Sequence, residues 1–231
     1  MSDNHSTWAK YYDEVNRECF GVYYDQLTDL TLNTINSLGD SLNIIDFGAG
    51  TGRLSIPLSR NHRVTAVEPS ASMLQQLKLK DTSKKITPVH AAMHEYRGSA
   101  DNDLALAVFT VISYILTEEQ LNASFKSVAQ SLKPNGQLLL DVPKIILFRD
   151  NFCETANLRR EIKFNEIGDH LYVYKESTRI REFSYTDSFK LRFWSTAELK
   201  TALNSAGLEI TDDLSSHFPM AGAHYWLCRK N

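Results

Sequence analysis

Apolar and polar residues follow a pattern along the chain that predicts helices and strands in alternation. Segments 8–20 and 22–38 place apolar residues at helical spacing, and a short apolar run at 44–47 is suited to a buried strand. The same patterns then predict helices at 52–60, 70–80 and 118–132, and strands at 63–68, 86–90, 103–109 and 137–142. Strands that alternate with helices in this way are typical of an α/β fold built on a parallel sheet.

The pattern changes after residue 142. Segments 171–183 and 189–193 are rich in aromatic and β-branched residues, and in the second of them apolar and basic residues alternate with period two. We therefore expect a small antiparallel sheet inserted between 143 and 194, with one turn at 167–169. A capping box at 195–198 then opens a helix, and the last two apolar runs are predicted to close the chain as a pair of strands.

The most informative stretch is 44–54, which reads as a strand, a tight glycine loop and the start of a helix. Gly48, Gly50 and Gly52 let the backbone turn and let a ligand approach the main chain, while the N–H groups of the helix start face that ligand. A dinucleotide site wants a further glycine where this chain has Arg53. Asp46, two residues before the first glycine, would repel a pyrophosphate and suits a ligand with a positive charge.

This loop, together with Glu68 at the end of the next predicted strand, resembles the class I S-adenosylmethionine-dependent methyltransferases. The pattern is most similar to small-molecule members of the sugar N,N-dimethyltransferase and glycine N-methyltransferase type. The resemblance implies a Rossmann-like, doubly wound seven-stranded mixed sheet with an antiparallel last strand, plus the small antiparallel insertion after strand five. Residues 1–231 are expected to form a single methyltransferase domain, in which a helical cap at 1–40 and the insertion at 143–194 enclose the acceptor site.

The resemblance also implies the cofactor, S-adenosyl-L-methionine, and its product, S-adenosyl-L-homocysteine. Asp46 is expected near the amino-acid end of the cofactor and Glu68 at the ribose hydroxyls. Relatives direct an acid towards the adenine amino group where this chain has Ala92, which removes one side-chain acceptor. The residues expected to contact the cofactor are Tyr12, Asp46, Gly48, Ala49, Gly50, Thr51, Gly52, Arg53, Glu68, Pro69, Met73, Ala92, Met93, Phe109, Thr110 and Val111.

Methyl transfer is an in-line displacement that depends mainly on alignment and desolvation, and a base is needed only if the acceptor must lose a proton. Tyr114, in the loop after the fourth core strand, is expected to line the transfer site. Tyr11 and His217 are further candidate catalytic residues, although an aromatic helix face or a surface histidine would explain them equally well. No cluster of Asp, Asn and His follows the fourth strand, so the reaction is expected to need no metal.

Composition and charge narrow the partners. The chain has 231 residues, of which 42% are hydrophobic, and a formal charge of −3, so nothing attracts it to nucleic acid or to an anionic membrane surface. Three widely spaced cysteines suggest free thiols in a reducing compartment. The polar N-terminus and the lack of a long apolar run indicate a cytoplasmic protein, a monomer or homodimer that acts on a small molecule.

Two alternatives stay open at the level of sequence. Because Ala92 replaces an acid, the chain could be a catalytically silent cofactor-binding protein that acts as a regulator or partner subunit. The strand, glycine loop and helix alone would also fit an NAD-dependent oxidoreductase.

Overall fold

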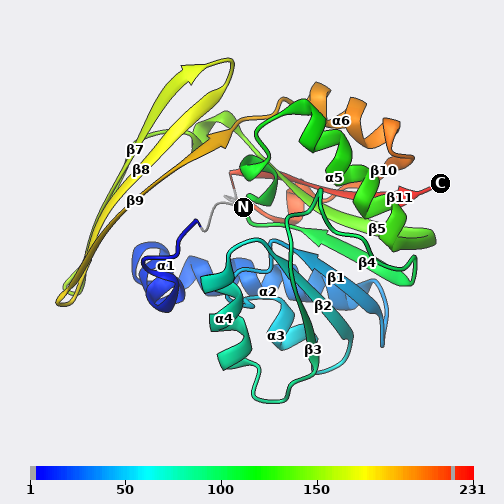
Figure 1. The fold of residues 1–231 in the computed structure, drawn as a ribbon, viewed down its shortest axis with the longest axis horizontal. Coiled ribbons are helices and arrows are strands. Elements are labelled where there is room, and N and C mark those ends of the chain that lie inside the picture. The colour runs from blue at the N-terminus through cyan, green and yellow to red at the C-terminus, as the bar shows by residue number, and fades with distance from the viewer. Residues whose placement is uncertain (1–3, 220–221) are drawn as a thin grey trace.

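The computed structural model describes residues 4–219 and 222–231, and its core is a seven-stranded sheet with the strand order β10-β11-β5-β4-β1-β2-β3 (Figure 1). Strands β1 to β5 run parallel to their neighbours within that group, whereas β11 is antiparallel to both β5 and β10. The bounds are β1 Asn43–Phe47, β2 Arg63–Glu68, β3 Ile86–His90, β4 Asn102–Ala107, β5 Leu132–Pro143, β10 Leu208–Asp213 and β11 Ala223–Lys230. The predicted mixed sheet with an antiparallel last strand is confirmed.

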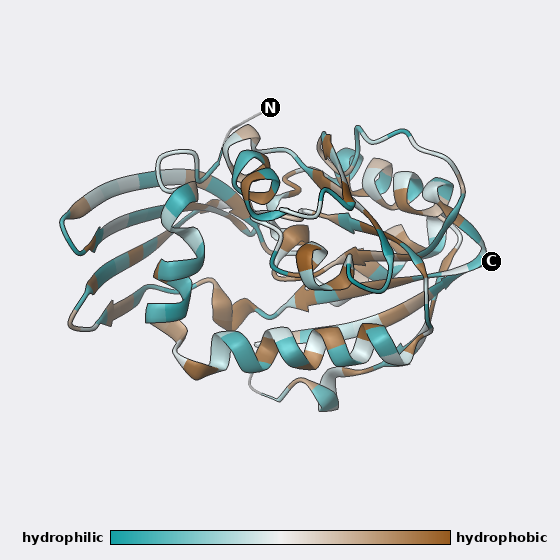
Figure 2. Cartoon of the chain, turned by 90° about the horizontal axis from the view of Figure 1, so that it is seen from below, coloured by the Kyte–Doolittle hydropathy of each residue, from teal (hydrophilic) through white to brown (hydrophobic). Residues whose placement is uncertain are grey.

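Helices cover both faces of this sheet. On one face, α5 (Glu118–Ser131) and α6 (Thr196–Ser205) bury side chains such as Phe125 and Leu199 against the strands. On the other face lie α2 (Val22–Ser37), α3 (Ser55–Leu58) and α4 (Ala71–Lys80). Figure 2 shows hydrophobic and hydrophilic residues in turn along the helices, as expected for helices with one buried face.

The N-terminal region is not a simple cap, because its second helix belongs to the core. Ile35 of α2 is fully buried in the same cluster as Ile44 of β1 and Leu104 of β4. Residues 1–40 are therefore more than a cap, since α2 is also part of the core. The shorter helix α1 (Tyr12–Phe20), preceded by a 3₁₀ turn at Ala9–Tyr11, packs elsewhere.

A second sheet of four antiparallel strands, in the order β6-β7-β8-β9, projects from one side of the core (Figure 1). Its strands are β6 Asn151–Glu154, β7 Leu158–Gly168, β8 Leu171–Ile180 and β9 Phe183–Arg192. The turn between β7 and β8 confirms the one predicted at 167–169. The turn between β8 and β9 was not predicted; Arg181, with a φ of 51°, stands there in the left-handed region.

Helix α1 and the preceding turn pack against this second sheet. Trp8 stacks on Tyr185 of β9, with 5.0 Å between ring centroids, and Val15 is buried against Leu158 and Ile180. The N-terminal segment and the inserted sheet, far apart in sequence, thus form one apolar cluster beside the core.

The helix after the glycine loop is shorter than the predicted segment 52–60. Backbone bonds from Ile56 to Gly52 and from Leu58 to Leu54 flank Pro57, which has no N–H to donate to the carbonyl between them. The segment is helical only over Ser55–Leu58. No helix in the two described segments of the chain is long and apolar enough to cross a membrane.

A buried ion pair fixes the inserted sheet to α1. Arg160 of β7 donates to both carboxylate oxygens of Glu176 of β8, at 2.9 and 3.0 Å, and to the side chain of Asn16 of α1 at 3.1 Å. Tyr174 and Tyr185 donate their hydroxyls to the same carboxylate. Burial alone would raise the pKa of Glu176, but Arg160 and these hydrogen bonds outweigh it and lower the pKa.

We predict that Glu176→Ala lowers the free energy of unfolding by about 3–5 kcal/mol, because it leaves the Arg160 charge buried without its partner. Glu154→Ala is the matched control, since Glu154 and Arg159 form an exposed pair in the same sheet; its loss is expected to cost about 0–1 kcal/mol. Urea unfolding of both variants measures the difference. Equal losses in the two variants would contradict the role assigned to the buried pair.

Candidate active site

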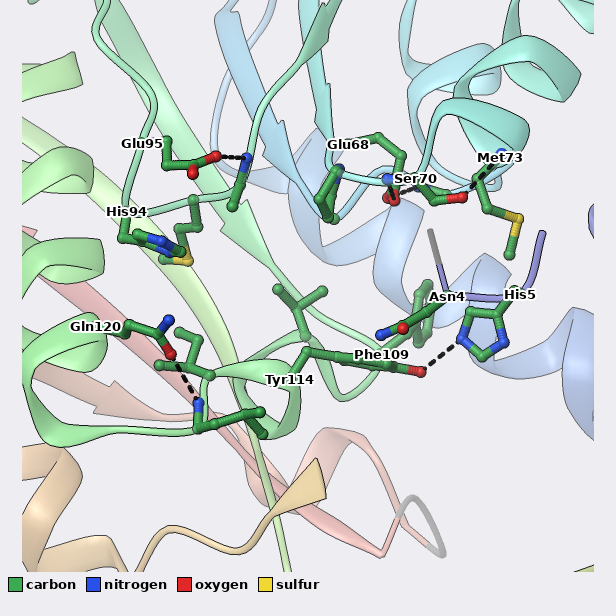
Figure 3. Close-up of a pocket in the computed structure, with 18 of the residues that line it drawn as sticks. Asn4, His5, Glu68, Ser70, Met73, His94, Glu95, Phe109, Tyr114 and Gln120 are labelled. Atoms are coloured by element: carbon green, nitrogen blue, oxygen red, sulfur yellow. Dashed lines mark hydrogen bonds between the residues drawn. The ribbon is translucent and has the colours of Figure 1, made fainter. Parts of the chain in front are cut away.

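A cavity of about 390 Å³ lies where the parallel strands β1, β2 and β4 end, a common place for ligands in sheets of this kind. Figure 3 shows Glu68 and Met73 on one side of it and Phe109 and Tyr114 on another. Many of the residues singled out from the sequence line this cavity. They are Tyr12, Gly48, Gly50, Glu68, Pro69, Met73, Ala92, Met93, Phe109, Val111 and Tyr114.

The glycine loop has backbone angles that favour glycine. Gly48 has a φ of +69°, and a Cβ added to it would lie 2.4 Å from a methyl of Val111. Gly50 has a φ of +55°, and a Cβ there would meet nothing closer than the Gly48 carbonyl at 4.0 Å. The first glycine therefore permits close packing of two loops, while the second leaves open space at the cavity edge.

Glu68 connects the two loops that border the cavity. Its carboxylate accepts hydrogen bonds from the backbone N–H of Gly50 and of Ser70, both at 2.8 Å. Ser70 in turn caps α4 by accepting from the N–H of Met73 at 3.3 Å. Glu68 is 7% exposed, so this carboxylate sits at the wall of the cavity with little contact with bulk water.

Asp46 does not line the cavity. It is 4% exposed and accepts a hydrogen bond from Ser55 at 2.5 Å, which ties β1 to the start of α3. Burial raises the pKa of this carboxyl to about 6, although the Ser55 hydrogen bond opposes the shift. The structure thus places Asp46 beneath the glycine loop, where its side chain supports the loop rather than facing the cavity.

The second half of the glycine loop also points away from the cavity. The Thr51 hydroxyl donates to Asp13 of α1 at 2.8 Å, and a Cβ on Gly52 would come within 2.8 Å of Ile56. Ala49 is buried in the core. Since these residues face protein on all sides, direct contact between their side chains and a ligand is not supported.

Arg53 is held between the aromatic rings of Tyr24 and Phe109. Its guanidinium carbon is 3.8 Å from each ring centroid. It also donates to the Tyr24 carbonyl at 2.6 Å and to the Thr28 hydroxyl at 2.7 Å. These contacts leave Arg53 outside the cavity lining and make it a link between α2 and the loop after β4.

That loop adopts an unusual backbone. Phe109 and Thr110 have φ values of 65° and 67°, in the left-handed region that few non-glycine residues occupy. The Thr110 N–H donates to both carboxylate oxygens of Asp141 on β5 at 3.0 Å. Burial raises the pKa of Asp141 to about 7, against the effect of these backbone bonds. Thr110 itself does not line the cavity; it anchors a loop that presents Phe109, Val111 and Tyr114.

Two candidate catalytic residues lie away from the cavity. Tyr11 stacks on Phe183 of the inserted sheet, with 4.6 Å between centroids, as part of the apolar cluster around Trp8. His217 is exposed in the 3₁₀ turn Ser215–His217, between β10 and β11. Neither position supports the role expected from the sequence.

Ala92 lies beside a carboxylate that the sequence analysis did not consider. Glu95, three residues later, also lines the cavity and accepts a hydrogen bond from the Ala92 N–H at 3.2 Å (Figure 3). An acid one turn beyond the substituted position was the signal that could have identified it. Further lining residues missed from the sequence are Asn4, His5, Ser70, His94, Ile115, Leu116 and Gln120.

Comparison with known proteins decides the family. A family model described as a methyltransferase domain matches residues 44–136. The "Putative methyltransferase YqeM" of Bacillus subtilis is 31% identical over 181 residues, which are 77% of this chain and 71% of that protein. The chain belongs to the S-adenosylmethionine-dependent methyltransferases.

A second relative is also described as a methyltransferase, and solved structures of low sequence identity share the fold. The "Putative methyltransferase GWCH70_2453" of a Geobacillus strain is 27% identical over 143 residues, 60% of this chain, and the match spans 57% of the relative's length. Among solved structures, an S-adenosylmethionine-dependent methyltransferase from Clostridium acetobutylicum has a TM-score of 0.80 at 19% identity and covers 98% of this chain and 99% of its own. CalS10 from Micromonospora echinaspora, solved with S-adenosylmethionine bound, has a TM-score of 0.75 at 16% identity, with 95% and 96% covered.

The methyltransferase is an enzyme whose cofactor is S-adenosylmethionine. Of the two alternatives left open by the sequence, the NAD-dependent oxidoreductase is wrong, and the silent scaffold finds no support in the comparisons. In the described part of the chain, no three His, Cys, Asp or Glu side chains are grouped as metal ligands would be.

The pKa of Asp141 generates a testable pH dependence. In the folded methyltransferase the carboxyl of Asp141 keeps its proton up to about pH 7. An ordinary aspartate in the unfolded chain loses its proton near pH 4. Ionisation therefore opposes folding, and through this group the free energy of unfolding falls as the pH rises from about 4 to 7, with Asp46 acting in the same direction up to about pH 6.

We predict that the free energy of unfolding falls less in Asp141→Asn than in the parent between about pH 5 and pH 8. The difference between the two proteins is expected to be roughly 2–3 kcal/mol. Urea unfolding at both pH values measures this difference. The exposed Asp212 provides the control, since Asp212→Asn is expected to leave the pH dependence of the parent. A parent-like pH dependence in Asp141→Asn would show that Asp141 ionises normally.

Proposed function

We propose that this enzyme transfers the methyl group of S-adenosylmethionine to a nitrogen or oxygen atom of a small molecule bound in the cavity at the ends of β1, β2 and β4. The observation that carries the proposal is the cavity itself. It is about 390 Å³ in volume and is bordered by the glycine loop, by Glu68 and by the loop after β4.

The residues around the cavity fit the cofactor in three places. Glu68 offers a buried carboxylate for the ribose hydroxyls, beside the open edge at Gly50. Met73 and Met93 offer apolar surface for the adenine ring. The Glu95 carboxylate lies beside position 92, where it could accept a hydrogen bond from the adenine amino group. We therefore propose that the cofactor is bound by those residues of the predicted set that line the cavity. Six residues of that set do not line it and are left out: Asp46, Ala49, Thr51, Gly52, Arg53 and Thr110.

The charges at the cavity favour an acceptor that is neutral or cationic. Two carboxylates, Glu68 and Glu95, contribute to its wall, and within residues 4–219 and 222–231 no lysine or arginine does. Three aromatic residues, Tyr12, Phe109 and Tyr114, also line the cavity, and aromatic rings attract cations. An acceptor with an amine or hydroxyl fits this lining, whereas a carboxylate or phosphate on the acceptor would find no lysine or arginine in the described wall to pair with it. The description of CalS10 as an amino pentose methyltransferase agrees with this class of acceptor.

When bound, the sulfonium supplies an activated methyl group. The protein's own contribution is alignment and exclusion of water: Phe109, Val111 and Tyr114 form one wall from a single loop, and Asp141 holds that loop in its left-handed conformation. The inserted sheet supports this wall from behind, because Phe189 of β9 stacks on Tyr114 with 5.6 Å between ring centroids. We propose that α1 and the insertion enclose the acceptor site mainly by packing against the residues that line it, as Phe189 packs on Tyr114.

One prediction of the proposed function concerns the cofactor. Glu68→Ala is expected to weaken the binding of S-adenosylhomocysteine by about 1.5–3 kcal/mol, the range for hydrogen bonds to a charged group. Isothermal titration calorimetry measures it, with the exposed Glu209→Ala on β10 as the control. Because Glu68 also joins two loops, circular dichroism should establish that the variant is folded. A folded variant that binds S-adenosylhomocysteine like the parent would remove Glu68 from the site.

Another prediction of the proposed function concerns the acceptor. We expect release of S-adenosylhomocysteine to be fastest with glucosamine, slower with glucose, and at background with glucuronate and glucose 6-phosphate. The other three compounds each differ from glucose in one group. The reason is the absence of a cation from the described cavity wall. Faster release with either anion than with glucosamine would contradict the proposed acceptor class.

A further inference from the structure

An imidazole that the sequence analysis overlooked stands at the edge of the cavity. His5 lies among four aromatic rings, with centroid distances of 5.2 Å to Trp8, 5.6 Å to Tyr12, 5.9 Å to Tyr114 and 4.8 Å to Phe189. Its Nε2 is 2.9 Å from the Tyr114 hydroxyl (Figure 3), and its Nδ1 is 3.4 Å from Oδ2 of Asp187 on β9. Both His5 and Tyr114 line the cavity.

We propose that Tyr114, His5 and Asp187 form a proton relay that removes the proton from the methyl acceptor. This inference rests on the proposed function and adds to it the base that the reaction requires when the acceptor carries an N–H or O–H proton. It also gives the inserted sheet a direct part in the reaction, since Asp187 comes from β9.

Asp187 is placed to orient the imidazole. Its carboxylate accepts the N–H of the Trp8 indole at 2.9 Å and the backbone N–H of His5 at 3.2 Å, so the N-terminal segment is fixed around it. Burial alone would raise the pKa of Asp187, but hydrogen bonds from His5 and Trp8 outweigh it and lower the pKa, so the group is a carboxylate at neutral pH. His5 Nδ1 is buried and makes no hydrogen bond to the described residues, but it lies 3.4 Å from this carboxylate, and the nearby negative charge favours the tautomer with the proton on that nitrogen. Nε2 is then left as an acceptor for the Tyr114 hydroxyl.

Tyr114 is placed to pass a proton on rather than to hold a charge. The side chain as a whole is 36% exposed and lines the cavity, but desolvation of the phenol raises its pKa well above the ordinary value, with further contributions from Tyr12, Tyr174, Glu68 and Asp187, so the hydroxyl stays protonated. A neutral hydroxyl can accept a proton from the acceptor only if it gives its own proton to a neighbour at the same time. His5 Nε2 is that neighbour.

The proton and electron balance of the step closes within these groups. The acceptor's lone pair forms the new bond to the methyl carbon, and the carbon–sulfur bond breaks with its electron pair remaining on sulfur. The acceptor's proton moves to Oη of Tyr114 while the Tyr114 proton moves to Nε2 of His5. The resulting imidazolium lies beside the Asp187 carboxylate and returns its proton to solvent after the product leaves.

The tautomer of His5 can be measured without any acceptor. We expect ¹⁵N NMR of the full-length, histidine-labelled enzyme to show neutral His5 with its proton on Nδ1, the signals being assigned with His5→Gln. In Asp187→Asn the proton should shift towards Nε2. A parent enzyme with the proton on Nε2 would overturn the relay, since His5 could not then accept from Tyr114.

Turnover of glucosamine tests the relay in the reaction. His5→Ala and Tyr114→Phe are each expected to lower kcat about a hundredfold, with the affinity for S-adenosylhomocysteine unchanged. Added imidazole should restore activity to His5→Ala, because it can occupy the space left among the rings of Trp8, Tyr12 and Phe189, and should not restore Tyr114→Phe. His217→Ala, in the exposed turn outside the cavity, is the control and should behave like the parent.

Full activity in His5→Ala, or a loss that imidazole does not reverse, would overturn the relay and leave His5 as a packing residue of the N-terminal segment. Those results would leave the proposed function standing. Failure of the parent enzyme to methylate glucosamine or glucose, with S-adenosylhomocysteine still bound, would instead count against the proposed acceptor class. In that event the NMR measurement alone decides the relay.

Discussion

The hydrogen bonds accepted by Glu68 are the contact on which the active site depends. This one carboxylate holds the glycine loop through the Gly50 N–H and the start of α4 through the Ser70 N–H, and so joins the ends of β1 and β2. Because it is buried, water competes little for these bonds, and each contributes more than it would at the surface. The same carboxylate is the one proposed for the ribose, so under that proposal one group both shapes the cavity and recognises the ligand.

The sequence predicted those features that depend on local pattern. The order of strands and helices, the inserted sheet and the loop from Gly48 to Gly52 all follow from short-range periodicity and glycine placement, and the structure has them. Side-chain direction was harder to predict. Asp46 and Thr51 belong to the recognised motif, yet they turn to Ser55 and Asp13, because the shortened helix α3 and the helix α1 approach the loop from outside the cavity.

The residues that the sequence analysis missed reach the cavity through tertiary contacts. His5 precedes any periodic segment, and tertiary contacts bring it to Tyr114: Trp8 packs on Tyr185, and Asp187 accepts from the Trp8 indole and the His5 backbone N–H. Glu95 lies in a loop without regular structure, where the backbone bond from Tyr96 to the Ala92 carbonyl folds a single turn. No spacing rule connects such residues with the glycine loop, since His5 lies 43 positions before Gly48 and Glu95 lies 43 positions after Gly52.

The inserted sheet carries its polar groups to the site by strand register. Glu176 of β8 stands directly opposite Asp187 of β9, and directly opposed side chains point to the same face of a sheet. The bidentate pair with Arg160 favours the register in which Glu176 is buried towards α1, because a slip of one residue would turn the carboxylate to the other face. The same slip would turn Asp187 away from His5 and Trp8. A buried ion pair distant from the glycine loop therefore favours the strand register in which the Asp187 carboxylate lies beside His5.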